Sequence, residues 1–242
     1  MSERKLLGML VPSSNTVLEP MCAAMLAGVP DVSAHFARFR VTEISLAPAA
    51  LDQFQFQPML EAASLLADAK VDSVCWNGTS ASWLGLDTDR SLCSAIQSRT
   101  GIKATSAVLG LAQIFQQTGI SRFGLVSPYT ADVQSRIVAN FRTEGFECVA
   151  ERHGGLSDNF SFSEVTSQTL QKMIREVASA GPQAITVLCT NLAGAALVEA
   201  LEAEIGLPIY DSVAVALWGS LRTAGVDPAR IKGWGSLFRN VR

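Results

Sequence analysis

Three pairs of similar segments occur in the same order in the two halves of this 242-residue chain. The pairs are Leu7–Ser13 with Phe123–Tyr129, Gly78–Ser80 with Cys189–Asn191, and Gly101–Val108 with Gly206–Ala214. Their offsets lie between 105 and 116 residues, and an ordered repeat of this kind is typical of a duplicated fold. We therefore predict two halves of one architecture, the first over residues 1–110 and the second over residues 111–242. These bounds are approximate, because the first half can also receive the C-terminal helix.

Within each half, short apolar runs alternate with segments of helical periodicity. We predict strands at Leu6–Val11, Ala34–Val41, Ser73–Trp76, Lys103–Thr105, Phe123–Val126, Cys148–Arg152, Ala184–Leu188 and Pro208–Tyr210. Amphipathic helices are predicted at Leu51–Ala69, Asp87–Thr100, Ala107–Thr118, Thr130–Glu144, Ser163–Ala180, Leu192–Ile205 and Val213–Ala224. Strands that alternate with helices form parallel sheets covered by those helices. The expected fold class is α/β, with two pseudo-two-fold related parallel-sheet halves and the active site in the cleft between them.

The polar residues of most interest follow the predicted strands directly. They lie in Pro12–Thr16, Gly78–Ser82, Pro128–Thr130 and Cys189–Asn191. Ligands of parallel α/β sheets bind beyond the carboxyl ends of the strands, and a two-fold arrangement brings both sets of strand ends to one cleft. At matching positions the second half has Cys189 and the first half has Gly78. One thiol is therefore present where a two-fold design would offer two.

The same strand-end segments resemble the aspartate/glutamate racemase superfamily, in its branch of maleate isomerases and arylmalonate decarboxylases. The resemblance covers essentially the whole chain. The Val-Pro-Ser-Ser-Asn-Thr run at residues 11–16 is typical of the maleate isomerases, whereas Gly78-Thr79-Ser80 with a lone cysteine in the second half is typical of the decarboxylases. Enzymes of this superfamily act on carbon acids or activated double bonds without a metal or an organic cofactor. Its racemases and isomerases use two cysteines, and Gly78 takes the place of the first.

The resemblance implies a catalytic role for four residues. Cys189 would protonate an enediolate, and Thr79, Ser80 and Tyr129 would stabilise it, helped by the backbone N–H groups of Ser80 and Thr190. A free cysteine has a pKa of roughly 8.5, so near neutrality it is mostly the protonated thiol that this role requires.

The resemblance also implies a substrate-binding role for five residues besides these four. Asn15 and Asn159, together with Tyr129, match residues that hold substrate carboxylates in maleate isomerases. The other substrate-binding positions are Pro12, Gly78 and Thr190. Neutral amide and phenol donors suit this task, since a carboxylate held by them can leave after turnover.

Each of these residue types also has an ordinary structural role. Cysteine is among the most buried residue types, and core positions are expected for Cys22, Cys75, Cys93 and Cys148. In the purely structural interpretation, the remaining positions provide a tight turn at Gly78, a helix cap at Thr79 or Ser80, an interior tyrosine at Tyr129, turn residues at Asn15 and Asn159, and solvated side chains at Arg38 and Arg40.

Composition and motifs exclude several classes of protein. Five cysteines without CxxC spacing argue against a disulfide framework or a zinc site. A net charge of -3 and the lack of a long basic run argue against nucleic acid, and the apolar runs are too short for a membrane helix. GxxxxGK[ST] and GxGxxG motifs are absent from the sequence. We expect a cytoplasmic protein that works on a small dicarboxylic acid without cofactor or metal, as a monomer or homodimer.

Three functions remain compatible with the sequence. The preferred one is a cofactor-independent decarboxylase of a substituted malonate-type dicarboxylic acid, in which one cysteine protonates an enediolate. The second is an isomerase or racemase of a small dicarboxylate, similar to maleate isomerase, which needs a second proton carrier. The third is a protein without catalytic activity that binds a small ligand in the same cleft.

Overall fold

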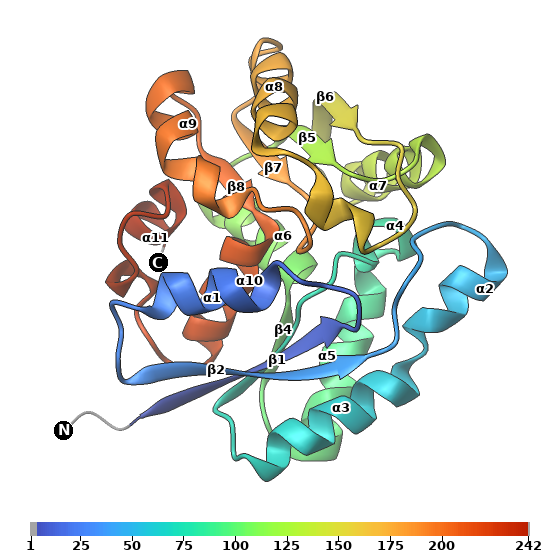
Figure 1. Ribbon diagram of the computed structural model, residues 1–242, viewed down its shortest axis with the longest axis vertical. Coiled ribbons are helices and arrows are strands. Elements are labelled where there is room, and N and C mark those ends of the chain that lie inside the picture. The colour runs from blue at the N-terminus through green and yellow to red at the C-terminus, as the bar shows by residue number, and fades with distance from the viewer. Residues whose placement is uncertain (1–3, 242) are drawn as a thin grey trace.

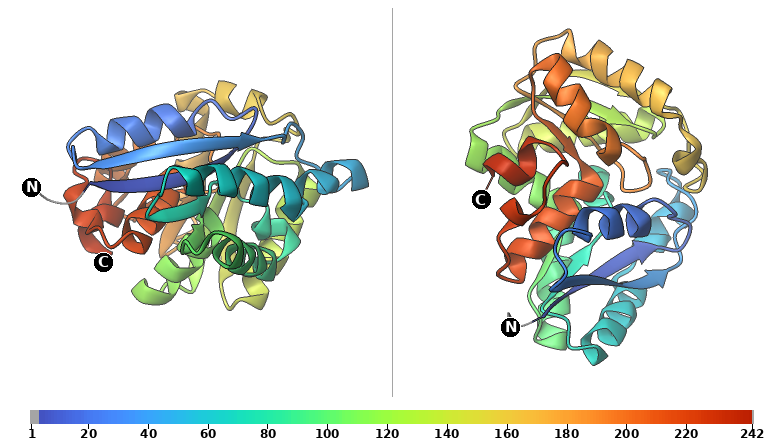
Figure 2. Two further views of the ribbon diagram at one scale, coloured as in Figure 1. Left: turned by 90° about the horizontal axis from the view of Figure 1, so that it is seen from below. Right: turned by 60° about the vertical axis from the view of Figure 1, so that its left-hand side comes forward.

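The computed structural model describes residues 4–241 as two four-stranded sheets whose strands all run parallel. The first sheet has the order β2-β1-β3-β4 and the second the order β6-β5-β7-β8. The strands are β1 Lys5–Pro12, β2 Val32–Phe39, β3 Ser73–Trp76, β4 Ala104–Ser106, β5 Arg122–Ser127, β6 Glu147–His153, β7 Ala184–Val187 and β8 Ile209–Asp211. The two orders are equivalent, so the predicted α/β class with two related halves is confirmed. In the right-hand view of Figure 2 the blue strands of the first half lie below the green to yellow strands of the second.

Helices connect the strands and cover both faces of each sheet (Figure 1). The α-helices are α1 Leu18–Leu26, α2 Pro48–Leu51, α3 Phe56–Asp68, α4 Ala81–Leu84, α5 Leu86–Thr100, α6 Ala107–Thr118, α7 Ala131–Thr143, α8 Ser167–Ala178, α9 Val198–Ile205, α10 Ser212–Thr223 and α11 Ser236–Asn240. Among the described residues, four short 3-10 helices complete the set: η1 Asp52–Phe54, η2 Ser161–Glu164, η3 Ala195–Leu197 and η4 Pro228–Arg230. Within residues 4–241, no helix has both the length and the apolar character needed to cross a membrane.

The helix boundaries differ from the sequence prediction in several places. The helix predicted from Ser163 begins only at Ser167, after η2 and the extended Val165. The helix predicted over Leu51–Ala69 is divided, because Gln55 adopts an extended conformation between η1 and α3. The helix predicted from Leu192 begins as η3 and becomes α-helical only at Val198. Helices α1, α4 and α11 were not predicted. Of these, α1 has no capping side chain at Val17, because the capping oxygen comes from Asn15, three residues before the first helical residue Leu18.

The helix that follows the fourth strand of each half packs on the other half. In α6, Phe115 contacts Phe123 of β5 and Tyr210 of β8. In α10, the backbone oxygens of Ser220 and Ala216 accept hydrogen bonds from Ser73 and Cys75 of β3. Figure 1 shows both helices at the centre of the molecule. This exchange joins the two halves into one body with their strand ends facing each other.

Candidate functional site

A small cavity lies where the carboxyl ends of the two sheets meet. Its volume is about 20 Å³, which leaves room for about one water molecule. It is lined by Pro12, Val41, Ile44, Phe54, Trp76, Gly78, Thr79, Ser80, Trp83, Tyr129, Asn159, Cys189 and Thr190. The structure therefore brings eight of the nine predicted site residues to one cavity, and the exception is Asn15.

Cys189 follows β7 by two residues and is 3% exposed. Its sulfur accepts a hydrogen bond from the backbone N–H of Asn191 at 3.3 Å. Burial raises the pKa of the thiol to about 12, although hydrogen bonds from the Tyr129 hydroxyl and the Asn191 amide oppose the rise. Cys189 is therefore a protonated thiol over the whole physiological range.

Tyr129 and Thr79 form a hydrogen bond between the two halves. Their hydroxyl oxygens lie 2.5 Å apart, and the Tyr129 hydroxyl also contacts the Cys189 thiol. Burial, followed by the nearby Cys189, raises the pKa of Tyr129 well above its usual value. The phenol therefore stays protonated, so that a chain of neutral donors runs from Thr79 through Tyr129 to Cys189.

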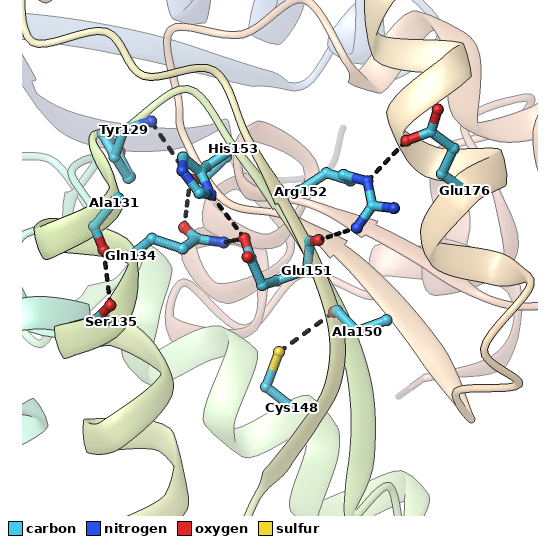
Figure 3. Close-up of polar contacts among 11 residues, drawn as sticks. Tyr129, Ala131, Gln134, Ser135, Cys148, Ala150, Glu151, Arg152, His153 and Glu176 are labelled. Carbon is cyan, nitrogen blue, oxygen red and sulfur yellow. Dashed lines mark hydrogen bonds and ion pairs between the residues drawn. The ribbon is translucent and has the colours of Figure 1, made fainter.

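A polar network behind Tyr129 fixes its backbone. The Tyr129 N–H points to the hydroxyl of Ser127 at 3.4 Å, and this hydroxyl donates to the amide oxygen of Gln134 at 2.6 Å. The Gln134 amide then donates to Glu151 at 2.9 Å, and Glu151 also contacts His153 (Figure 3). Since Ser127 and Gln134 are buried, the position of Tyr129 is set by β5, α7 and β6 together.

Asn15 supports the site from outside the cavity. Its amide nitrogen donates to the backbone oxygen and to the hydroxyl of Thr190, at 3.1 and 3.2 Å. Its amide oxygen accepts the backbone N–H groups of Val17 and Leu18 and so caps α1. The Thr190 hydroxyl in turn donates to the backbone oxygen of Asn77 at 2.8 Å. Asn15 thus holds the turn that carries Cys189, with both ends of its amide already in use.

Asn159 lies at the edge of the cavity in a segment that closes it. Its amide nitrogen donates to Ser14 at 2.7 Å, and its backbone oxygen accepts from Asn191 at 2.6 Å. The backbone around it pairs with the first half, since Asn159 N–H donates to Thr42 and Ile44 N–H donates to Ser157. Residues 41–44 of the first half and residues 157–159 of the second half are therefore hydrogen-bonded to each other and close this edge of the cavity.

Gly78, Thr79 and Ser80 connect β3 to α4. Ser80 precedes α4 but makes no side-chain capping bond, and its hydroxyl instead accepts the indole N–H of Trp76 at 3.4 Å. Pro12 ends β1, the neighbouring strand of the same sheet, and also lines the cavity. The cap predicted as a structural role for Ser80 is wrong, because the hydroxyl is turned toward Trp76.

The other candidate groups lie away from the cavity. Cys75 is fully buried in β3, where its thiol points at α10 and burial raises its pKa to about 12. Cys22 is buried, and Cys93 and Cys148 are half-buried. Arg38 and Arg40 are exposed, and Arg38 pairs with Glu19 at 2.6 Å. None of these residues lines the cavity.

Sequence reasoning missed the apolar wall of the cavity, which consists of Val41, Ile44, Phe54, Trp76 and Trp83. The two tryptophans lie close to Thr79 in the sequence, which was the available signal. Trp83 packs edge-on against Tyr129, with 5.3 Å between the ring centroids. Its indole N–H is buried and has no acceptor within residues 4–241. A buried donor without an acceptor is costly, so a ligand oxygen at this position would be favourable.

The cavity thus combines neutral donors with one protonated thiol. None of the lining residues, all within the described part of the chain, carries a cationic side chain. Such a site can stabilise negative charge that develops on a bound oxygen through preorganised hydroxyl and N–H donors. It can also deliver a single proton from Cys189.

Comparisons with known proteins find relatives over nearly the whole chain. The model of the arylmalonate decarboxylase family matches residues 7–238. Maleate isomerase of Nocardia farcinica is 24% identical over 96% of this chain and 95% of its own length. Arylmalonate decarboxylase of Bordetella bronchiseptica is 23% identical over the same shares of the two chains.

Solved structures of such enzymes share the fold. A maleate cis-trans isomerase mutant from Nocardia farcinica, with a covalently bound succinylcysteine intermediate, superposes with a TM-score of 0.89 at 23% identity over the full length of both chains. A crystal structure of arylmalonate decarboxylase gives a TM-score of 0.77 at 22% identity, covering 97% of this chain and 99% of the other. The predicted resemblance to the branch of maleate isomerases and arylmalonate decarboxylases is confirmed.

Proposed function

The chain belongs to the arylmalonate decarboxylase family, and from this premise we propose that it is a cofactor-independent decarboxylase of a substituted malonate-type dicarboxylic acid. The observation that carries the proposal is the single thiol of the cavity. Among the lining residues that the structure describes, Cys189 has a sulfur and the matching Gly78 has none. One proton carrier is sufficient for decarboxylation, whereas a racemase needs one on each face of the carbon.

The reaction begins with loss of carbon dioxide. The bond between the central carbon and one carboxylate breaks, carbon dioxide leaves, and the electron pair remains as an enediolate. Thr79, Ser80 and Tyr129 donate hydrogen bonds to the enediolate oxygens, each worth roughly 3 to 4 kcal/mol in the transition state. These hydroxyls are held before the substrate arrives, so they need little reorganisation.

Cys189 completes the reaction by protonating the carbon. The S–H bond breaks, a C–H bond forms, and the thiolate that remains takes a proton from water. A raised pKa favours this role, because the thiol is fully protonated when the enediolate appears. An enediolate carbon is a much stronger base than a thiolate, so the transfer is downhill even from a thiol of pKa about 12.

The remaining carboxylate is oriented by neutral donors. Asn159 and Thr190 line the cavity together with Pro12 and Gly78, and we assign the binding of this carboxylate to the Asn159 amide and the Thr190 backbone N–H. The indole N–H of Trp83 is a further donor, since it has no acceptor within residues 4–241. Asn15 acts indirectly in this proposal, by holding Thr190.

An isomerase of a small dicarboxylate is the second candidate. It is favoured by the 24% identity to the maleate isomerase of Nocardia farcinica and by the succinylcysteine intermediate observed in a structure of the Nocardia enzyme. In this mechanism a cysteine thiolate adds to the double bond, and rotation follows. It requires an ionised Cys189, whereas burial holds the pKa of this thiol at about 12.

The test is proton NMR of the purified protein in D2O with malonates, maleate and amino dicarboxylates. We expect a malonate to disappear while one deuterium enters the α-carbon of the product. Cys189→Ala should abolish this turnover, and Cys75→Ala is the matched control, because its thiol is equally buried but points at α10. Full activity of Cys189→Ala would contradict the proposal. Exchange between two isomers without loss of a carboxylate would establish the second candidate instead.

A further inference from the structure

The indole ring of Trp76 occupies the space in front of Gly78. A Cβ atom placed on Gly78 would lie 2.0 Å from Cζ2 of Trp76 and 2.5 Å from both Cε2 and Cη2. These distances are far shorter than van der Waals contact, so the ring excludes a side chain of any size at position 78. Both residues line the cavity. The indole ring of Trp76 therefore occupies the space that the side chain of a second cysteine at position 78 would need.

Three contacts hold Trp76 in place. Trp76 is the last residue of β3 and is paired with Leu10 of β1 and Ser106 of β4. Its ring packs against Phe39 with 5.1 Å between the centroids. Its indole N–H donates to Ser80. The side chain is 0% exposed, so moving it would disrupt the centre of the first sheet.

Three other apolar residues of the first half that line the cavity are not held by a strand as Trp76 is. Val41, Ile44 and Phe54 lie outside the sheet, in the connection between β2 and α3. The cavity has room for about one water molecule, so entry of a dicarboxylic acid requires part of its wall to move, and we assign this movement to the segments outside the sheet. Trp76 is fixed in the sheet and remains where it is, so it limits the size of what the open site accepts.

We propose that Trp76 determines substrate specificity, by restricting the site to malonate-type diacids that carry hydrogen or a small alkyl substituent and by rejecting aryl substituents. This inference rests on the function proposed above. In this proposal the indole faces the reacting carbon from the side of Gly78, and Cys189 faces it from the matching position of the second half. An aryl ring on that carbon meets a rigid wall, whereas a methyl group does not.

The test is isothermal titration calorimetry on Cys189→Ala, which keeps the cavity but lacks the thiol. Malonate and methylmalonate should bind at least about tenfold more tightly than phenylmalonate. In Cys189→Ala/Trp76→Leu, phenylmalonate should gain about tenfold or more, and malonate should change by less than about threefold. Equal binding of phenylmalonate and methylmalonate with Trp76 present would overturn the inference, and so would binding of none of the three diacids. Size-selective binding without release of carbon dioxide by the wild type would contradict only the proposed function.

A stability measurement tests the position of the ring without any ligand. Gly78→Ala should lower the melting temperature by roughly 5 °C or more, because the new Cβ must displace a buried ring. The same substitution should cost much less in a Trp76→Leu background, or in Trp76→Phe if the leucine variant does not fold. An equal effect of Gly78→Ala in both backgrounds would show that the indole does not fill this space, and the inference would fall.

Discussion

The hydroxyl groups of Thr79 and Tyr129 lie 2.5 Å apart, and this bond joins a residue from each half of the chain across the cavity. Thr79 follows β3 and Tyr129 follows β5, so each hydroxyl is placed by a strand of a different sheet. The Tyr129 hydroxyl also reaches the Cys189 thiol. The pair therefore links the proton donor of the second half to the Gly78-Thr79-Ser80 turn of the first.

Removal of the phenol hydroxyl should impair catalysis strongly. We expect Tyr129→Phe to lower kcat by roughly 100-fold to 1000-fold, the usual loss for one donor to a developing oxyanion. Tyr210→Phe is the matched control, since Tyr210 is the other tyrosine of the sequence and lies against Phe115, away from the cavity. Steady-state assays of both variants check the prediction. An unchanged kcat in Tyr129→Phe would remove Tyr129 from the mechanism.

The two hydroxyls should also be coupled. Thr79→Val should lower kcat, and the double variant Thr79→Val/Tyr129→Phe should lose less than the product of the two single effects, because each substitution already breaks the shared bond. A double-mutant cycle on kcat measures this coupling. Effects that multiply without any coupling would mean that the two hydroxyls act independently.

The pH dependence of kcat/KM should distinguish the two candidate reactions. With the pKa of Cys189 raised to about 12, the thiol that donates a proton is present at full concentration below that value. We therefore expect a flat profile between about pH 7 and pH 10 for decarboxylation. An isomerase that uses the thiolate would gain about tenfold in rate for each pH unit over the same interval, because the thiolate fraction rises in that proportion. A profile measured with the wild type at constant ionic strength decides between them.

Much of this fold could be predicted from the sequence because its strands are short apolar runs. β3 was predicted with its observed bounds, and the other strands agreed within two residues. The strand ends then located the cavity, since parallel sheets expose their functional residues there. What could not be predicted is what depends on contacts between the halves. The exchange of α6 and α10 is one example, because the periodicity of a helix does not reveal which sheet it covers.

The positions of single side chains in and around the cavity could not be predicted from local sequence either. Trp76 reads as an ordinary core residue at the end of an apolar strand, and only the turn of the chain at Gly78 brings its ring into the cavity. Asn15 was predicted to contact the substrate, but its amide is used by Thr190 and by the first turn of α1. Local spacing could not show this contact, because 175 residues separate Asn15 from Thr190 along the chain.

Asn15 should act on catalysis through Thr190. Asn15→Asp keeps an oxygen that can cap α1, but it replaces the donor to Thr190 by an acceptor that faces two oxygen atoms. We expect kcat to fall by about tenfold or more and the free energy of unfolding to fall by about 1 to 3 kcal/mol. Kinetic assays and urea unfolding measure the two effects. Asn15→Asp with wild-type kcat would contradict a positioning role.

Two buried carboxyl groups should make the free energy of unfolding fall as the pH rises. Burial raises the pKa of Asp89 and of Asp211 from 3.8 to about 7. A group whose folded-state pKa is raised stabilises the fold fully below its unfolded pKa, and this contribution is lost as the pH rises through the folded-state value. Between about pH 4 and pH 7 each aspartate should therefore destabilise the folded chain progressively, by about 4 kcal/mol at most.

Asp89→Asn tests this directly. Asp89 lies in the first turn of α5 with an oxygen that has no partner within residues 4–241, and asparagine has nearly the same shape but no charge. The free energy of unfolding of Asp89→Asn relative to the wild type should rise by several kcal/mol from pH 4 to pH 8, as measured by urea unfolding at each pH. Asp87→Asn is the control for the loss of a carboxylate in the same helical turn, because the Asp87 side chain is 91% exposed. A constant difference for Asp89→Asn would mean that Asp89 is already ionised in the folded protein at low pH.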